Sequence, residues 1–198
     1  MNKKLLMLIG SGVIIICIII AMKFMKGVKT IEEALGIPSK NSAKIIAEDK
    51  TPKGSVVFSY SKEKDSLYTS FIRKSLFGYE ELYSGVAGDI TEASEKLKLS
   101  YNYFPAIKQS SLPIYFGIMG EDKIKEVKVK EAESKDGWKS AKIIEAEGKR
   151  IWIIYMEGFK GSKFNIVGIS ESGEEIVSIT DNISPRKAED KPIKSPYK

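Results

Sequence analysis

A chain of 198 residues with a formal net charge of +6 suits one folded domain beside a membrane anchor, because it is too short for two well-filled cores. Residues 1–29 carry five lysines and no acid, and residues 184–198 carry five basic and two acidic side chains, so the middle of the chain is net −2 and a nucleic-acid partner is not expected. The chain lacks histidine and its single cysteine is Cys17, which excludes a histidine base, a histidine or thiolate metal site and an intrachain disulfide.

The first predicted element is a transmembrane helix. Eighteen residues without a charge lie between Lys4 and Lys23. A helix of that length reaches about 27 Å, close to the hydrocarbon thickness of a bilayer, and lysines at both ends reach the headgroups. We assign residues 1–27 to an anchor that contacts membrane lipid through the apolar run, which includes Leu5, Val13, Ile16, Ile20 and Met22.

Three other interpretations of this run fit the sequence less well. A buried strand is rarely longer than about ten residues. A cleaved signal peptide needs small residues at the end of the run, where Ala21 is the only one before the charge returns. A lipidated Cys17 would follow a small residue, and Ile16 stands there. An uncleaved signal anchor is therefore favoured, with its short basic tail in the cytoplasm and the following domain outside the cell membrane. The three lysines after the run nearly balance that tail.

Residues 28–183 are predicted to form an extracytoplasmic, mainly β domain. It starts with a short juxtamembrane helix, because Thr30 and Glu33 have the spacing of a capping box and Gly36 with Pro38 ends the turn. From there the apolar period changes to two, with turn residues at regular intervals, which is typical of antiparallel strands. Residues 90–99 alone favour a second helix.

Several strands and hairpins can be placed. Val56, Phe58 and Tyr60 share one face of a strand that follows a turn at residues 51–54, and residues 125–133 alternate as an edge or half-exposed strand would. Residues 114–119 and 151–156 are apolar on both faces, so we expect central strands covered on each side. Two-residue signals predict hairpin loops at Asp136-Gly137, Glu147-Gly148 and Ser172-Gly173.

These patterns predict eight to ten strands in an antiparallel sandwich or a strongly curled sheet. Residues 184–198 hold three prolines among charged side chains. We expect this segment to be a disordered basic tail.

No motif identifies a catalytic or cofactor site, and no cofactor is expected. Ser59 to Lys62 and Ser61 to Lys64 match the serine-x-x-lysine spacing of penicillin-recognising enzymes, but that geometry needs a helix where a strand ending in a polar loop is predicted. Paired carboxylates can catalyse hydrolysis without histidine, and the candidates are Glu80, Glu81 and Asp89.

A possible binding surface is suggested by aromatic side chains. Tyr101 and Tyr103 stand among lysines, a mixture that stacks bases or sugars, although such aromatics are more often core or rim residues. Trp138 follows a hairpin signal and would face a neighbouring strand. The candidate surface residues are Tyr79, Tyr101, Tyr103 and Trp138.

The last signal is a set of five short phrases, at residues 30–35, 77–79, 114–118, 150–152 and 167–169 before Gly173. Taken together, they resemble a group of uncharacterised, membrane-tethered or secreted domains of spore-forming Gram-positive bacteria. The likeness covers residues 30 to about 180. Similar proteins often carry tryptophan where Tyr79 stands, so a role for that position is not carried over. The resemblance implies a small extracytoplasmic β domain and brings no known activity.

The functional hypothesis is a noncatalytic interaction or sensing domain that is held at the membrane, where it meets an envelope peptide, protein or glycan at high local concentration. Two alternatives stay open. One is a carboxylate-dependent cell-envelope hydrolase, and the other is a cytoplasm-facing regulator of a membrane partner.

Overall fold

The computed structural model describes residues 12–19, 27–37, 43–107, 109–159, 161–183 and 187–188. Residues 12–19 are helical, and the side chains of Val13 and Ile16 are exposed on this segment. Leu5, Ile20 and Met22, also assigned to the anchor, lie outside the described residues. Within the described part of the chain, no helix has both the length and the apolarity that crossing a bilayer requires.

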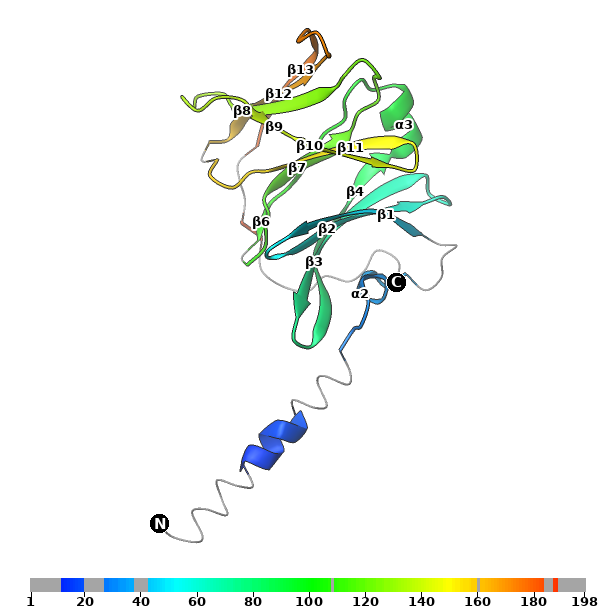
Figure 1. Ribbon diagram of the computed structural model, residues 1–198, viewed down its shortest axis with the longest axis vertical. Coiled ribbons are helices and arrows are strands. Elements are labelled where there is room, and N and C mark those ends of the chain that lie inside the picture. The colour runs from blue at the N-terminus through cyan, green and yellow to red at the C-terminus, as the bar shows by residue number, and fades with distance from the viewer. Residues whose placement is uncertain are drawn as a thin grey trace.

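Three four-stranded antiparallel sheets make up the domain (Figure 1). Sheet 1 is a meander in which each strand pairs with the next along the chain, and it contains β1 (Lys44–Thr51), β2 (Gly54–Ser61), β3 (Ser66–Ser75) and β4 (Gly78–Asp89). Sheet 2 has the order β10 (Lys142–Ala146), β11 (Lys149–Tyr155), β7 (Ile114–Ile118) and β5 (Asn102–Phe104). Sheet 3 has the order β13 (Glu175–Asn182), β12 (Lys163–Ile169), β8 (Glu126–Glu131) and β9 (Lys139–Ser140).

The prediction of a mainly β, antiparallel fold is confirmed. Fourteen strands occur among the described residues, more than the predicted eight to ten, because several are only two or three residues long and give no periodic signal. One pair is parallel: β6 (Ala106–Ile107) lies beside β14 (Lys187–Ala188). The latter belongs to the segment predicted as a disordered tail, whose other residues, 184–186 and 189–198, lie outside the described part.

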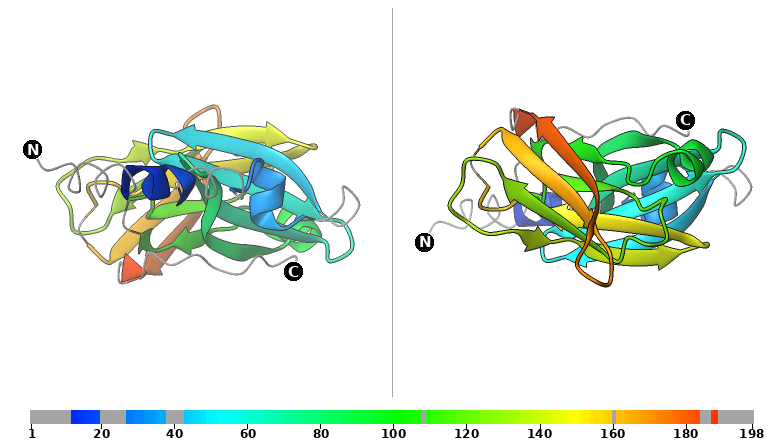
Figure 2. Two further views of the ribbon diagram at one scale, coloured as in Figure 1. Left: turned by 90° about the horizontal axis from the view of Figure 1, so that it is seen from below. Right: turned by 90° about the horizontal axis from the view of Figure 1, so that it is seen from above.

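Sheet 2 is the middle layer and is covered on both faces. All five residues of β7 are buried. Ile114 and Phe116 belong to the core shared with sheet 1, whereas Tyr115 belongs to the core shared with sheet 3. The same alternation divides Ile153 from Trp152 in β11. This burial confirms the prediction of two central strands, and Figure 2 shows the outer layers on opposite sides of the molecule.

A tryptophan fixes the middle sheet to the segment that precedes β5. The indole Nε1 of Trp152 donates to the carbonyl oxygen of Ser100 at 2.9 Å. Gly117 lies under this contact, and a Cβ there would collide with the Ser100 carbonyl. Only glycine allows the backbone to approach so closely, which explains its place inside a buried strand.

A buried carboxylate joins sheet 1 to sheet 2. Asp49 of β1 accepts a hydrogen bond from the Tyr155 hydroxyl of β11 at 2.8 Å and forms an ion pair with Lys142 of β10. Both carboxylate oxygens therefore have donors, which is the condition under which burial of a charge is tolerated.

The outer face of sheet 1 is covered by α2 (Ile31–Leu35), whose buried Leu35 packs on Val57 and Ile72. Half of the predicted capping box is confirmed, because the Thr30 hydroxyl accepts from the Glu33 amide at 3.1 Å. The Glu33 carboxylate instead accepts from the amide of Lys29 at 2.7 Å. Gly36 ends the helix at φ 65°, as predicted.

Three of the predicted turns join paired strands, whereas Asp136 and Gly137 lie within a longer connection, residues 132–138, between β8 and β9. β10 and β11 are joined at Glu147 and Gly148, both at positive φ, and β12 and β13 are joined through Gly173 at φ 85°. Residues 51–54 connect β1 to β2. The strand expected at residues 125–133 is β8, which has neighbours on both sides and is therefore half-exposed rather than an edge. The second predicted helix is α3 (Ile90–Glu95).

Candidate functional site

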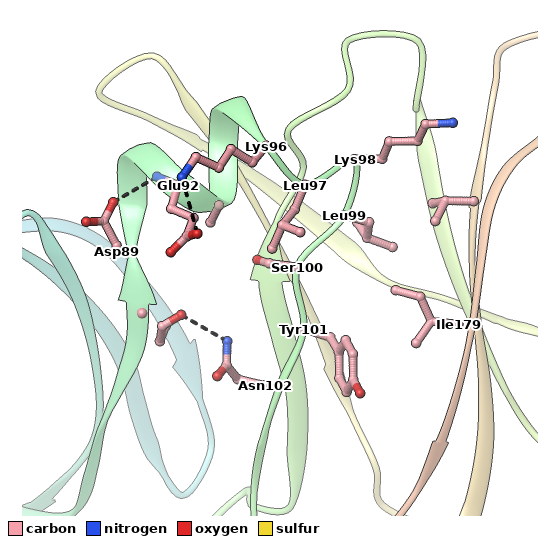
Figure 3. Close-up of a pocket in the computed structure, with 14 residues that line it drawn as sticks. Asp89, Glu92, Lys96, Leu97, Lys98, Leu99, Ser100, Tyr101, Asn102 and Ile179 are labelled. Carbon is pink, nitrogen blue, oxygen red and sulfur yellow. Dashed lines mark hydrogen bonds and ion pairs between the residues drawn. The ribbon is translucent and has the colours of Figure 1, made fainter.

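A cleft of about 530 Å³ lies between α3, residues 96–102 and strand β13 (Figure 3). One wall is built where β4 turns into α3. There Asp89 caps the helix, since its Oδ1 accepts from the Glu92 amide at 2.8 Å. Ile90 and Ala93 bury the inner face of the helix. The cap and these two apolar contacts hold α3 firmly at the mouth of the cleft.

Apolar side chains from distant parts of the sequence line the cleft. Leu97 is 48% exposed, and Tyr101 is also exposed. Val177 and Ile179 enter from β13, where they pack partly on the core between sheets 2 and 3. Figure 3 shows Leu97, Tyr101 and Ile179 around one space. The cleft can therefore bury the side chains of an apolar ligand.

The rim is polar and carries both signs of charge. Lys96 lies 3.5 Å from Glu92 on α3, and this pair is exposed to water, where such a contact contributes little energy. Lys98 has no ion-pair partner among the described residues lining the cleft. Asn102 donates to the carbonyl oxygen of Ala87 at 3.3 Å, which links the edge of sheet 2 to the end of β4.

The floor of the cleft follows the open edge of sheet 2. Among the residues that the structure describes, β5 is the last strand of that sheet and pairs with β7 alone. Just before β5, the amide of Ser100 donates to the carbonyl oxygen of Ile118 at 2.9 Å. Because hydrogen-bonding directions alternate along an antiparallel strand, the backbone N–H and C=O of Tyr101 point to the side where no described strand pairs with them.

A tyrosine cluster supports this edge from below. The rings of Tyr101 and Tyr103 lie 6.5 Å and 5.3 Å from the ring of Tyr115, whose hydroxyl donates to Asp181 of β13 at 2.6 Å. Burial, followed by the hydrogen bond to Asp181, raises the pKa of Tyr115. Burial likewise raises the pKa values of Tyr101 and Tyr103. These hydroxyls therefore stay neutral at physiological pH.

The structure does not bring the four predicted surface residues together at one site. Tyr101 lines the cleft, but Tyr103 packs against the core beside it, and its hydroxyl is buried without a described hydrogen-bond partner. Tyr79 packs against α2 on the outer face of sheet 1. Trp138 is exposed immediately before β9. Aromatic residue type alone did not indicate which of these rings face solvent.

The three candidate carboxylates do not converge either. Glu80 pairs with Arg73 at 3.0 Å. Glu81 is buried and accepts from the Ser70 hydroxyl at 3.0 Å. Glu80 and Glu81 are adjacent on β4 and therefore point to opposite faces of the sheet, while Asp89 caps α3. No general acid and base pair is formed by this set.

The residues that sequence reasoning missed are Leu97, Val177 and Ile179. A signal was present in residues 176–180, an alternating run without a charge after a hairpin turn, which is unusual for an exposed edge strand. Comparisons of the chain with family models, curated proteins and solved structures find no match.

Proposed function

We propose that the protein is a noncatalytic binding domain, anchored in the cell membrane by residues 5–22 and facing outward, that takes up an extended peptide segment of an envelope partner in the cleft. The observation that carries this proposal is the open edge of sheet 2 along an apolar cleft. An extended peptide adds to such an edge through its main chain, and its alternate side chains enter pockets on either side.

The geometry of the edge sets the register of the peptide. The Tyr101 backbone offers one donor and one acceptor to the incoming strand. A peptide side chain that points toward β13 would meet Val177 and Ile179, and one that points toward α3 would meet Leu97. The ligand expected from this arrangement is a segment of alternating apolar and polar residues. The cleft would recognise it by the fit of its apolar side chains rather than by ion pairs.

The anchor and the outward orientation rest on the sequence. The uncharged run of 18 residues has the length of a membrane span, and the basic tail before it favours a cytoplasmic N-terminus. The resemblance to membrane-tethered extracytoplasmic domains of spore-forming bacteria agrees with this arrangement. Holding the cleft at the membrane raises its effective concentration toward an envelope partner.

The binding test uses the full chain in lipid nanodiscs and fluorescein-labelled heptapeptides with valine at every second position and serine, lysine or glutamate between. Fluorescence anisotropy should report saturable binding that Leu97→Glu weakens at least tenfold. Val86→Glu is the matched control. Val86 is 55% exposed and follows the opposite face of β4 from Ala87, which lines the cleft.

Two results would contradict the peptide assignment. One is the absence of saturable binding across the panel, and the other is an equal loss of affinity in Leu97→Glu and Val86→Glu. A peptide with proline at its centre should bind more weakly, because proline lacks the amide that the edge strand needs. Protease added to intact protoplasts tests the orientation separately. An outward domain is digested, whereas a domain that survives faces the cytoplasm and supports the regulator alternative.

A further inference from the structure

The β3–β4 hairpin ends in two large apolar side chains. Its register pairs Ser75 with Gly78, so the loop consists of Leu76 and Phe77 alone. Leu76 is 85% exposed and Phe77 is 37% exposed. Two-residue hairpin loops normally carry asparagine, aspartate or glycine, and a leucine with most of its surface in water contributes nothing to the core. The loop therefore has a composition that the turn itself does not require.

The start of β4, directly after this loop, is hydrogen-bonded to the segment that follows the apolar N-terminal run. The Tyr79 amide donates to the carbonyl oxygen of Val28 at 2.9 Å. A Cβ at Gly78 would collide with that same carbonyl, so glycine is needed for the contact. Farther along the chain, Leu35 of α2 packs on Ile72 of β3. The chain thus enters the domain at the hairpin, and Figure 1 shows the hairpin projecting beside α2.

The length of chain between the two features is short. Val28 is six residues after Met22, the end of the apolar run, so six chain steps join them. Six fully extended steps span about 20 Å, and six helical steps span about 9 Å. The polar headgroup layer on each side of a bilayer is about 5–8 Å thick. If the apolar run spans the membrane as proposed above, the start of β4 and the loop before it lie at the bilayer surface or within a short distance of it.

The charge near the hairpin suits a membrane surface. Lys74, one residue before the turn, is exposed, and its Nζ lies 5.5 Å from the centre of the Tyr79 ring. Lys26 and Lys29 flank Val28 in the sequence. Basic residues next to exposed apolar side chains bind anionic headgroups while the apolar groups enter the acyl boundary.

We propose that Leu76 and Phe77 insert into the bilayer leaflet from which the anchor emerges, so that the domain has two points of attachment. This inference rests on the proposed anchor. The second attachment fixes the orientation of the domain and holds the cleft beside α3 away from the lipid, since Figure 1 shows α3 in the half of the domain farther from the hairpin and α2.

The test places one environment-sensitive fluorophore on the hairpin of the full chain. In a Cys17→Ser background, Leu76→Cys is labelled with a nitrobenzoxadiazole dye, and the protein is reconstituted into phosphatidylcholine vesicles with phosphatidylglycerol. Ser172→Cys is the matched control, because Ser172 lies in the β12–β13 turn at the other end of the domain. Spin-labelled lipid should quench the dye at position 76 at least twofold more than the dye at position 172, with a blue-shifted emission.

Vesicle flotation distinguishes a failed anchor from a failed hairpin. A chain that does not float with vesicles overturns both proposals. A chain that floats while lipid quenches positions 76 and 172 equally overturns the hairpin insertion and leaves the anchor standing. Phe77→Cys serves as a second labelling site, and circular dichroism of each labelled protein verifies that its sheets are intact.

Discussion

Replacing Tyr155 with phenylalanine should make the folded protein less sensitive to alkaline pH. The Tyr155 hydroxyl donates to buried Asp49, and burial together with that hydrogen bond raises the pKa of Tyr155. A tyrosine in the unfolded chain ionises near pH 10. Above that pH the unfolded chain loses a proton that the folded chain keeps. The contribution of Tyr155 to folding stability is therefore fully present below about pH 10 and falls as the pH rises.

The size of the effect follows from the linkage relation. At pH 11, ionisation of one tyrosine in the unfolded state lowers the free energy of unfolding by about 1.4 kcal/mol. The wild-type chain carries this loss at Tyr155 and again at Tyr115, whose pKa is raised in the same direction. Tyr155→Phe should be less stable at pH 8 by about 1–2 kcal/mol, because a hydrogen bond to a charged group is removed. It should then lose about 1.4 kcal/mol less than wild type between pH 8 and pH 11.

Urea unfolding in detergent, followed by circular dichroism at both pH values, measures the difference. Trp138→Phe serves as the control, since it changes an exposed aromatic residue that carries no titrating proton, and its alkaline loss should equal that of wild type. The reasoning is refuted if Tyr155→Phe loses as much stability as wild type between pH 8 and pH 11.

Two further predictions concern stability. Gly117→Ala should lower the free energy of unfolding by about 3 kcal/mol, because the new Cβ would displace the Ser100 carbonyl. The control Gly137→Ala places its Cβ in open space and should change the free energy of unfolding by less than about 0.5 kcal/mol. Equal urea midpoints for the two variants would contradict the close approach at Gly117. Hydrogen bonds from Thr91 and Tyr60 lower the pKa of Asp65, so its stabilising contribution is present above about pH 4 and is lost as the pH falls through the lower folded value. The melting temperature of Asp65→Asn should therefore fall less between pH 5 and pH 2 than that of wild type. An equal fall in the two proteins would contradict a stabilising role for the Asp65 carboxylate.

The middle sheet could be predicted from the sequence because its signal is local. Five successive apolar residues from Ile114 to Ile118 require cover on both faces, and the structure provides it. The hairpins at Glu147-Gly148 and Gly173 were predictable for the same reason, since their φ angles select particular residues. The stacking of three sheets was not predictable, because periodicity shows that a face is buried and does not show what buries it.

The cleft is a different case, since it joins residues that are far apart in sequence. Leu97 and Ile179 meet only because β13 lies beside the edge of sheet 2, and no local pattern contains that information. The aromatic residues illustrate the same limit. Tyr101 and Tyr103 are two positions apart and belong to one face of the strand, yet one reaches the cleft while the other packs in the core beside it.

The order in which strands join the three layers constrains how the chain acquires its structure during synthesis. β1 to β4 pair in sequence, so this meander needs only short loop closures. Sheets 2 and 3 are interleaved along the chain, because β8 and β9 come between β7 and β10. β7 receives its partner β11 only after some thirty intervening residues have been made, and such nonlocal pairing is slow. Until then the inner face of the meander, with Phe58 and Phe71, is an exposed apolar surface that invites association between nascent chains.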